Sequence, residues 1–334
     1  MDYRKLGPTG IEVSSLCLGT MMFGAWGNTD HDDCARIIHR ALETGINFID
    51  TANMYSDGEC EEIIGKALSG RRDRAILATK VYFPMGDGPD DRGLSRVAIV
   101  KQVEASLRRL GTDYIDLYQI HRPDPTVSWE ETLGALDDLV RQGKVRQIGC
   151  STNHHDVGDV PRLTAWQIVQ TFRLSDANGW NRFVSLQPPY SILRRTMERE
   201  HFPMTLDLGM ANIVWSPLEG GWLAGNYRYG SEPADQNSPR YKRWIKDTHD
   251  PKFERRSKVV EGLAEYLEHR EGRPVGMAEF SLAWVLSNPA VTSAIIGPRT
   301  MEQLENCFGA LNVEITEADR ARVDELVPPG ETAL

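Results

Sequence analysis

Residues 47–68 read NFIDTANMYSDGECEEIIGKAL, which joins a short apolar strand, a loop and a helix-like segment. The strand is expected at Asn47–Asp50, and the helix within CEEIIGKAL at residues 60–68. A second apolar run, AILATKV at Ala75–Val81, follows directly and has the length of a buried strand. This stretch therefore predicts a β-then-α unit that leads into the next strand.

The same unit recurs along nearly the whole chain. Eight runs are expected to be strands, each followed by a segment able to form a helix: Val13–Leu18, Asn47–Asp50, Ala75–Val81, Tyr114–His121, Val145–Cys150, Phe183–Gln187, Ala211–Ser216 and Ser293–Ile296. Eight consecutive units are typical of a (β/α)8 barrel, the TIM barrel. The alternative, a doubly wound sheet, usually has a glycine-rich turn after its first strand, and no GxGxxG occurs here. We expect one α/β barrel domain over residues 1–334.

One long segment interrupts the pattern after the seventh strand. Residues 226–256 are rich in Pro, Asp, Ser and basic residues and show little periodicity. A loop of about 30 residues is unusual in a compact domain and often has a function. We therefore predict a lid or mobile insertion within the barrel domain. Lys242, Arg243 and Trp244 are candidates to fold over a bound ligand, with a solvated surface as the alternative.

Composition narrows the classes of partner. The chain has 334 residues and a formal charge of −10, which disfavours nucleic acids and anionic membranes as main partners. Small anions stay possible because a few local donors can outweigh a diffuse charge. The five cysteines are scattered without CxxC spacing, which indicates reduced thiols. No run approaches the length of a membrane span. We expect a cytoplasmic protein that is a monomer by default.

Metal and thiol chemistry are weakly indicated. His154 and His155 have no third ligand at metal-binding spacing, and HExxH is absent, so no metal site is expected. Cys150 ends the fifth predicted strand and is either a reactive thiol or, as we favour, a small buried side chain.

Four side chains of the second to fourth units have the chemistry of an active site. Barrel enzymes place their reactive groups at the carboxyl ends of the strands. Asp50, Lys80 and His121 end or nearly end three successive strands, and Tyr55 lies in the loop after the first of these. Each residue alone has an ordinary explanation, such as a helix cap, a rim aromatic or a solvated charge. Together they are expected to converge on one side of the barrel mouth.

Such a quartet suits protonation of an oxygen atom. A tyrosine hydroxyl has a pKa of about 10 and is a weak acid at neutral pH. An ammonium group about 4 Å away favours the phenolate by about 4 kcal/mol at an effective dielectric of about 20, an upper bound of roughly three pKa units. An aspartate paired with the lysine keeps it charged and gives back part of this effect. The histidine can orient a substrate oxygen, as for a carbonyl that receives a hydride.

The chain resembles the aldo-keto reductases. The resemblance rests on GINFIDTANMYSDGECEEIIGKAL, AILATK and DLYQIH, with further matches in SLCLGTMMFG, RQIGCSTN, FVSLQPPY, VWSPLEGGWLAG and SAIIGPRTMEQL. It is strongest to the bacterial and plant branch that includes potassium-channel β subunits. It implies a barrel that binds NADPH without a Rossmann motif and reduces aldehydes or ketones to alcohols. It also implies that Tyr55 is the general acid, tuned by Lys80, that Asp50 anchors Lys80, and that His121 orients the carbonyl.

The resemblance further implies a cofactor site. Its residues are Gly19, Thr20, Met21 and Asp50 near the nicotinamide, Ser151, Thr152 and Gln187 at its carboxamide, Trp215 stacked on its ring, Ser216, Pro217, Leu218, Gly220 and Gly225 at the pyrophosphate, and Gly297, Arg299, Gln303 and Asn306 at the 2′-phosphate and adenine. Arg299 favours NADP(H), because a guanidinium suits a phosphate, and NAD(H) stays open. Two positions depart from the family, since Thr152 and Cys307 replace asparagines.

The substrate pocket and one alternative function complete the expectations. Trp26 is expected to line the pocket together with Tyr55 and His121, and Met22 and Phe23 either join this wall or pack at the rim. The alternative to a reductase is a cofactor-binding regulatory or redox-sensing module with slow turnover, as the resemblance to channel subunits suggests. The physiological substrate is not encoded in any motif.

Overall fold

The computed structural model describes residues 1–153, 162–233 and 235–334, and within these residues eight parallel strands form a closed barrel. In barrel order the strands are β3 (Leu16–Gly19), β4 (Phe48–Asp50), β5 (Ile76–Val81), β6 (Ile115–Ile120), β7 (Val145–Ser151), β8 (Ser185–Gln187), β9 (Ala211–Val214) and β10 (Ser293–Ile296). The ring closes where β10 pairs with β3, with Ile296 opposite Leu18. The predicted (β/α)8 barrel is confirmed.

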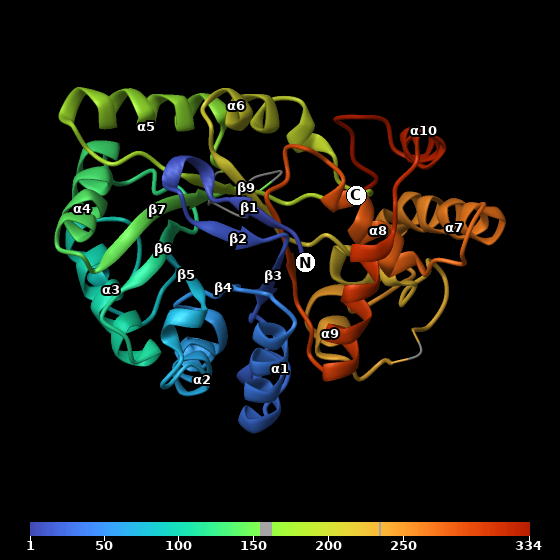
Figure 1. Cartoon of the computed structure of the whole chain (residues 1–334), viewed down its shortest axis with the longest axis horizontal. Helices are drawn as coiled ribbons and strands as arrows, with labels where there is room; N and C mark the ends of the chain where they lie inside the picture. Colours follow the sequence, from blue (N-terminus) through green and yellow to red (C-terminus); the bar gives the residue numbers. More distant parts are fainter. Residues whose placement is uncertain (154–161, 234) are drawn as a thin grey trace.

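Helices surround the barrel (Figure 1). They are α1 (His31–Glu43), α2 (Glu59–Ala67), α3 (Arg96–Leu110), α4 (Trp129–Arg141), α5 (Ala165–Asn178), α6 (His201–Asp207), α7 (Glu254–His269), α8 (Met277–Leu286), α9 (Met301–Phe308) and α10 (Glu317–Leu326). Their starts follow from local chemistry, since Asp30 caps α1 and Ser95 caps α3 by accepting from free backbone N–H groups. The buried face of α1 carries Ile37 and Ile38 onto the strands.

The first predicted strand, Val13–Leu18, is two strands in the structure. Strand β2 (Glu12–Ser14) pairs antiparallel with β1 (Tyr3–Lys5), and β3 begins only at Leu16. The change comes at Ser14, whose N–H donates to Asn47 Oδ1 (2.8 Å) and whose hydroxyl donates to Leu16 O (2.6 Å). The apolar run is continuous across this break, so its periodicity could not show it.

The barrel interior changes from apolar to polar along the strands. Leu6 and Val13 of the N-terminal hairpin form one apolar cluster with Phe48 and Leu117 at the amino ends of the strands. Because strand side chains alternate in direction, residues two positions apart lie on the same face. Two positions further along, β4 carries Asp50 and β6 carries Gln119, and both are buried. The carboxyl ends therefore hold the polar layer of the barrel.

The long segment after β9 folds onto the same half of the molecule. It contains a π-helical turn, Tyr241–Ile245, and a short 3-10 turn, Pro251–Phe253, and its last residues begin α7 at Glu254. The Tyr241 ring stacks on Tyr227, with ring centres 6.4 Å apart. The segment is thus held by aromatic packing as well as by its ends.

Two further properties bear on the expectations. All five cysteines are free thiols. Across the three described ranges of the chain, the helices are too short or too polar for one to traverse a lipid bilayer.

Candidate functional site

A fully buried lysine lies at the centre of the polar layer. Lys80 Nζ donates to Asp50 Oδ2 (2.6 Å), to Thr51 O (2.7 Å) and to the Tyr55 hydroxyl (3.3 Å). An ammonium group has three N–H donors, so all three are used. The structure thus brings Asp50, Tyr55 and Lys80 together at the carboxyl ends of β4 and β5, as the strand-end rule predicts.

The carboxylate of Asp50 is fixed from its other side by two glutamines. Gln187 Nε2 donates to Asp50 Oδ1 at 2.7 Å, and Gln119 Nε2 donates to the same oxygen at 3.2 Å. The amide nitrogen of Gln187, expected at a cofactor carboxamide, is therefore engaged by Asp50. The sequence analysis missed Gln119. It lies two positions before His121 on β6 and opposite Lys80 in the register, which was a usable signal.

The pKa values of Lys80 and Tyr55 reflect burial as well as charge. Burial lowers the pKa of Lys80, but the charge of Asp50 and the contact with Tyr55 outweigh burial and raise the pKa overall, so the ammonium keeps its proton. Burial raises the pKa of Tyr55, and the Lys80 charge offsets this only in part. The charge of Lys80 alone predicts a lowered pKa for Tyr55. The net direction is the opposite because burial also removes water from the phenolate.

His121 completes the quartet as a neutral imidazole. Its ring meets the Tyr55 ring edge-on, with centres 5.9 Å apart, and it is buried. Its Nδ1 atom has no hydrogen-bond partner among the described residues. Burial, followed by the charges of Lys80 and Arg122, lowers the pKa of His121 well below its usual value. All four predicted residues therefore lie within one cluster.

Aromatic rings form a wall beside this cluster. Trp26 lies next to Tyr55, with ring centres 6.0 Å apart. On the other side Phe83 meets His121 edge-on at 4.9 Å, and Tyr82 meets Phe83 at 5.3 Å. The sequence analysis missed Tyr82 and Phe83, although both directly follow β5 and the strand-end rule reaches them when extended by two residues.

Two neighbours of Trp26 belong to the core. Met22 and Phe23 are buried, and Phe23 lies in the main apolar cluster between barrel and helices. Of the two interpretations weighed for these residues, the structure supports packing.

The predicted carboxamide residues form a connected patch beside Asp50. The Ser151 hydroxyl donates to Gln187 O (2.9 Å), and the Thr152 hydroxyl donates to Leu163 O (2.7 Å). Trp215 Nε1 donates to Thr152 O at 3.4 Å. The structure therefore brings these residues together, with both hydroxyl protons directed to the backbone.

The predicted nicotinamide residues after β3 also have structural roles. A Cβ atom at Gly19 would lie 2.5 Å from Ile295 Cγ2 and 3.0 Å from Ile296 O, so packing against β10 alone requires glycine there. Thr20 donates its hydroxyl proton to Asp50 O (3.1 Å), and Met21 is partly exposed.

The loop after β9 has an unusual backbone. Ser216, Glu219 and Gly220 have φ values of 57°, 45° and 65°. These left-handed residues close tight turns, in which Glu219 N donates to Ser216 O and Gly221 N donates to Leu218 O, both at 3.0 Å. Pro217 is buried within the loop, and Gly225 ends it with a φ of 76°.

Two arginines lie beside this loop. A Cβ atom at Gly220 would come within 3.5 Å of Arg240 Cδ. Burial lowers the pKa of Arg240, the charges of Tyr227 and Glu219 act against this, and the charge of Arg299 lowers it further. Arg299 was predicted, whereas Arg240 lies in the 226–256 segment and was missed because nothing local marks it.

The adenine end of the predicted site is organised differently from the family pattern. Gln303 Oε1 accepts from Arg299 N (2.8 Å), so Gln303 holds the loop before α9. Asn306 is exposed, while Cys307 donates to Gln303 O (3.2 Å) and burial raises its pKa to about 12. Gly297 is exposed, with open space around its Cα. Leu218 packs against the core.

The remaining sequence candidates are the residues considered for metal binding and for thiol chemistry. Within residues 1–153, 162–233 and 235–334, no group of three His, Cys, Asp or Glu side chains could hold a metal ion. His154 and His155 lie outside the described residues. Cys150 is buried, and burial raises the pKa of its thiol far above the usual value, which supports the packing interpretation.

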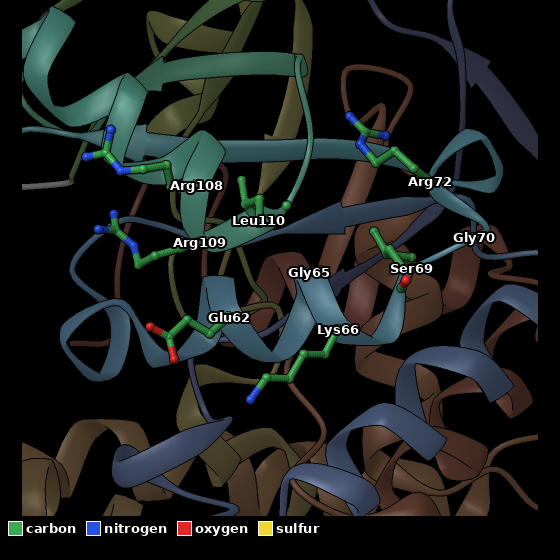
Figure 2. Close-up of a pocket in the computed structure, with 11 residues that line it drawn as sticks. Glu62, Gly65, Lys66, Ser69, Gly70, Arg72, Arg108, Arg109 and Leu110 are labelled. Atoms are coloured by element: carbon green, nitrogen blue, oxygen red, sulfur yellow. The ribbon is translucent and has the colours of Figure 1, made fainter.

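A charged groove lies elsewhere on the surface, between α2 and α3 (Figure 2). It is lined by Lys66, Arg72, Arg108 and Arg109 among others. Arg72 precedes β5 and Leu110 precedes β6, so the groove lies toward the amino ends of these strands. It is therefore separate from the cluster around Lys80.

A closed (β/α)8 barrel with its polar groups gathered at the carboxyl ends of the strands is the architecture of barrel enzymes. Comparison with protein families identifies the family of barrel enzymes to which the chain belongs. The Aldo/keto reductase family matches residues 15–328, and the chain belongs to this family.

Individual relatives agree with this assignment. The oxidoreductase YrpG of Bacillus subtilis (strain 168) is 39% identical over 99% of this chain and 97% of its own length. Versiconal hemiacetal acetate reductase of Aspergillus parasiticus is 32% identical over 99% of this chain and 100% of its own. A probable voltage-gated potassium channel subunit beta of Arabidopsis thaliana is 32% identical over 94% and 92%. The chain is an oxidoreductase of a family that generally uses nicotinamide cofactors.

Proposed function

We propose that the protein is an NADP(H)-dependent reductase of aldehydes or ketones, with Tyr55 as the general acid. The observation that carries this proposal is the buried Lys80 ammonium, which bonds both Asp50 and the Tyr55 hydroxyl. When bound, the nicotinamide cofactor supplies the hydride. The side chains of the cluster supply the proton and the position of the substrate oxygen.

Each residue of the cluster has a distinct role in this proposal. Tyr55, which keeps its proton at rest, donates it as negative charge develops on the substrate oxygen. Lys80 then stabilises the phenolate left behind, and Asp50 holds Lys80 in place and charged. His121, being neutral, donates a hydrogen bond that orients the carbonyl without adding a second full charge.

The cofactor residues implied by the family resemblance remain those we propose, and two features support them. Arg240 lies beside Gly220 in the loop after β9, and its positive charge together with that of Arg299 suits the phosphate groups of a dinucleotide. The patch of Ser151, Gln187 and Trp215 adjoins Asp50, where a nicotinamide would meet the proton donor. The guanidinium charges favour the extra phosphate of NADP(H).

We also propose that residues 226–256 act as a lid. The guanidinium of Arg243 lies over the Trp26 ring, 4.1 Å from its centre. This contact joins the segment after β9 to the loop after β3, beside Tyr55, whose ring contacts that of Trp26. Trp244 lies in the same π-helical turn, Tyr241–Ile245, and Lys242 is exposed.

The test is turnover by a Tyr55→Phe variant, followed by NADPH absorbance with a panel of aldehydes and ketones. We expect a loss of about 10²- to 10⁴-fold in kcat, because the general acid is gone. NADPH binding, measured by fluorescence titration, is expected to stay unchanged. Tyr118→Phe is the matched control and should keep full turnover, because Tyr118 belongs to the apolar core and its hydroxyl has no hydrogen-bond partner among the described residues. Near-complete turnover by Tyr55→Phe on an accepted aldehyde would show that another group protonates the oxygen.

The similarity to a probable channel subunit favours one other candidate, a cofactor-binding regulatory module. Such a module would bind NADPH with slow or no turnover and would form a stable complex with a partner protein. Steady turnover without a partner on pull-down distinguishes the reductase from it.

A further inference from the structure

One arginine at the barrel mouth, Arg122, has a donor atom that no described residue accepts from. Arg122 follows His121 directly after β6, and its Nη1 donates to His121 O at 2.7 Å. Its Nε atom is buried and has no hydrogen-bond partner among the described residues. The charged and titratable groups that act on Arg122 are Tyr55 and Tyr82, and in the described parts of the chain no carboxylate pairs with it.

Two other arginines of the barrel are paired, whereas Arg256 shares with Arg122 a buried Nε that has no hydrogen-bond partner among the described residues, but its guanidinium lies over the Trp222 and Phe253 rings. Arg109 bonds Glu61 at 2.7 Å, and Arg194 forms two bonds with Glu219, at 2.9 and 3.0 Å. A charge taken out of water is normally paired because its desolvation is costly. Arg122 is partly buried, burial lowers its pKa, and among the described residues no carboxylate pairs with it. An orphaned guanidinium beside a reaction centre indicates a binding role.

The charge balance of the mouth points to an anion. The positive charge of Lys80 is matched by Asp50, whereas the charge of Arg122 has no such match. Arg122 lowers the pKa of both Tyr55 and His121, so its charge is felt at the proposed proton donor. A guanidinium presents a planar fork of donors that fits a carboxylate with two parallel hydrogen bonds.

The wall beside Arg122 indicates what else the ligand carries. Tyr82 feels the charges of both Asp124 and Arg122, its ring contacts Phe83, and Phe83 contacts the His121 ring. Such a row of ring edges and faces offers stacking and apolar contact to an aromatic ring. A flat aryl group that bears a carboxylate satisfies both features at once.

We propose that Arg122 determines substrate specificity by binding a carboxylate, so that the preferred substrates are aryl aldehydes or ketones that carry a carboxylate group. This inference rests on the proposed reductase function. The carboxylate takes no part in bond making: the carbonyl carbon gains the hydride, its oxygen gains the Tyr55 proton, and the carboxylate leaves unchanged. Arg122 acts on binding and orientation.

The test compares 4-carboxybenzaldehyde with its neutral methyl ester. The Arg122→Gln variant should lose about 10- to 100-fold in kcat/KM for the acid, mainly through a higher KM, and less than about threefold for the ester. Arg122→Lys should recover part of the loss, because it restores the charge without the fork. Arg92→Gln is the matched control, since Arg92 is exposed and its charge also reaches Tyr82. We expect it to leave both substrates unaffected.

A binding measurement separates this inference from the proposed function. Calorimetry with oxidised NADP+ present, which cannot donate a hydride, should show at least about tenfold tighter binding of the acid than of the ester. Arg122→Gln should abolish that preference. If no carbonyl compound is turned over while this preference holds, the reductase proposal fails and the anion site stands. Equal affinity for acid and ester, or an equal loss for both in Arg122→Gln, would overturn the role of Arg122.

Discussion

The barrel mouth and the groove between α2 and α3 each contain a cation paired with a buried carboxylate. At the mouth the buried Lys80 bonds Asp50 at 2.6 Å, and in the lining of the groove the partly buried Arg109 bonds Glu61 at 2.7 Å. The remaining contacts differ. Lys80 also bonds the Tyr55 hydroxyl, which faces the aromatic wall, whereas Glu61 accepts from the buried Thr79 hydroxyl at 2.6 Å. One pair serves a reactive group and the other joins structural elements.

The groove shows that a charged hollow is not by itself a site. Two of its arginines are committed to ion pairs, since Arg72 bonds Asp116 at 2.6 Å in addition to the Arg109 pair, and the third, Arg108, is exposed. A Cβ atom at Gly65 would lie 2.6 Å from Arg109 O, so α2 and α3 are in backbone contact at the groove floor (Figure 2). The two regions differ in which groups their polar side chains bond, and not in the depth of the hollow.

The sharpest way to break this comparison is to remove each cation, as Lys80→Met and Arg109→Met. Both variants leave a buried carboxylate unpaired, so each should lose about 3–5 kcal/mol of unfolding free energy. Only Lys80→Met should also lose kcat, by at least about 100-fold per folded molecule, because Tyr55 loses its stabilising charge. Urea unfolding and turnover corrected for the folded fraction measure the two effects. A comparable fall in kcat for folded Arg109→Met would make the distinction wrong.

The sequence was sufficient for the frame of the site but not for its electrostatics. Asp50, Lys80 and His121 were predictable because strand ends converge in any closed barrel. The net direction of the Tyr55 pKa was not, because it depends on how much water surrounds the phenol in the folded chain. Arg122 is visible beside His121 in the sequence, yet the role proposed for it rests on a buried Nε that has no hydrogen-bond partner among the described residues, and that depends on distant segments.

Boundaries and long-range contacts were beyond local patterns as well. The break at Ser14 depends on Asn47, which lies 33 positions away. The approach of Arg243 to Trp26 joins two loops from opposite parts of the chain. Hydrophobic periodicity indicates which face of an element is buried, but it does not indicate which distant residues come into contact.

A second prediction concerns the pH dependence of the free energy of unfolding, to which we expect His121 at the barrel mouth to contribute. Unfolded histidine takes up a proton below a pH of about 6.5, whereas folded His121 stays neutral well below that value. The unfolded chain then binds more protons, so stability is complete above about pH 6.5 and falls as the pH decreases. Between about pH 7.5 and about pH 5.5 we expect the wild type to lose about 1 kcal/mol more than His121→Gln.

Urea unfolding of both chains at the two pH values measures this difference. His201 is also buried with a lowered pKa, but it is present in both chains and cancels. Lys66→Gln should keep the pH dependence of the wild type, since Lys66 is exposed at the rim of the groove. An identical pH dependence in the wild type and His121→Gln would mean that the imidazole is protonated or solvated in the folded state.

The smallest effect is expected at the rim of the groove, for the double variant Lys66→Gln, Arg108→Gln. Both side chains are exposed and lie in the last turns of α2 and α3, where a cation contributes only through the helix dipole. Stability should therefore change by less than about 1 kcal/mol, and kcat and KM should not change for 4-carboxybenzaldehyde or for its ester. Steady-state kinetics beside Arg122→Gln make the contrast direct. Were the double variant to raise KM for the acid alone, exposed cations would steer the anion, and Arg122 would not be the sole determinant of that preference.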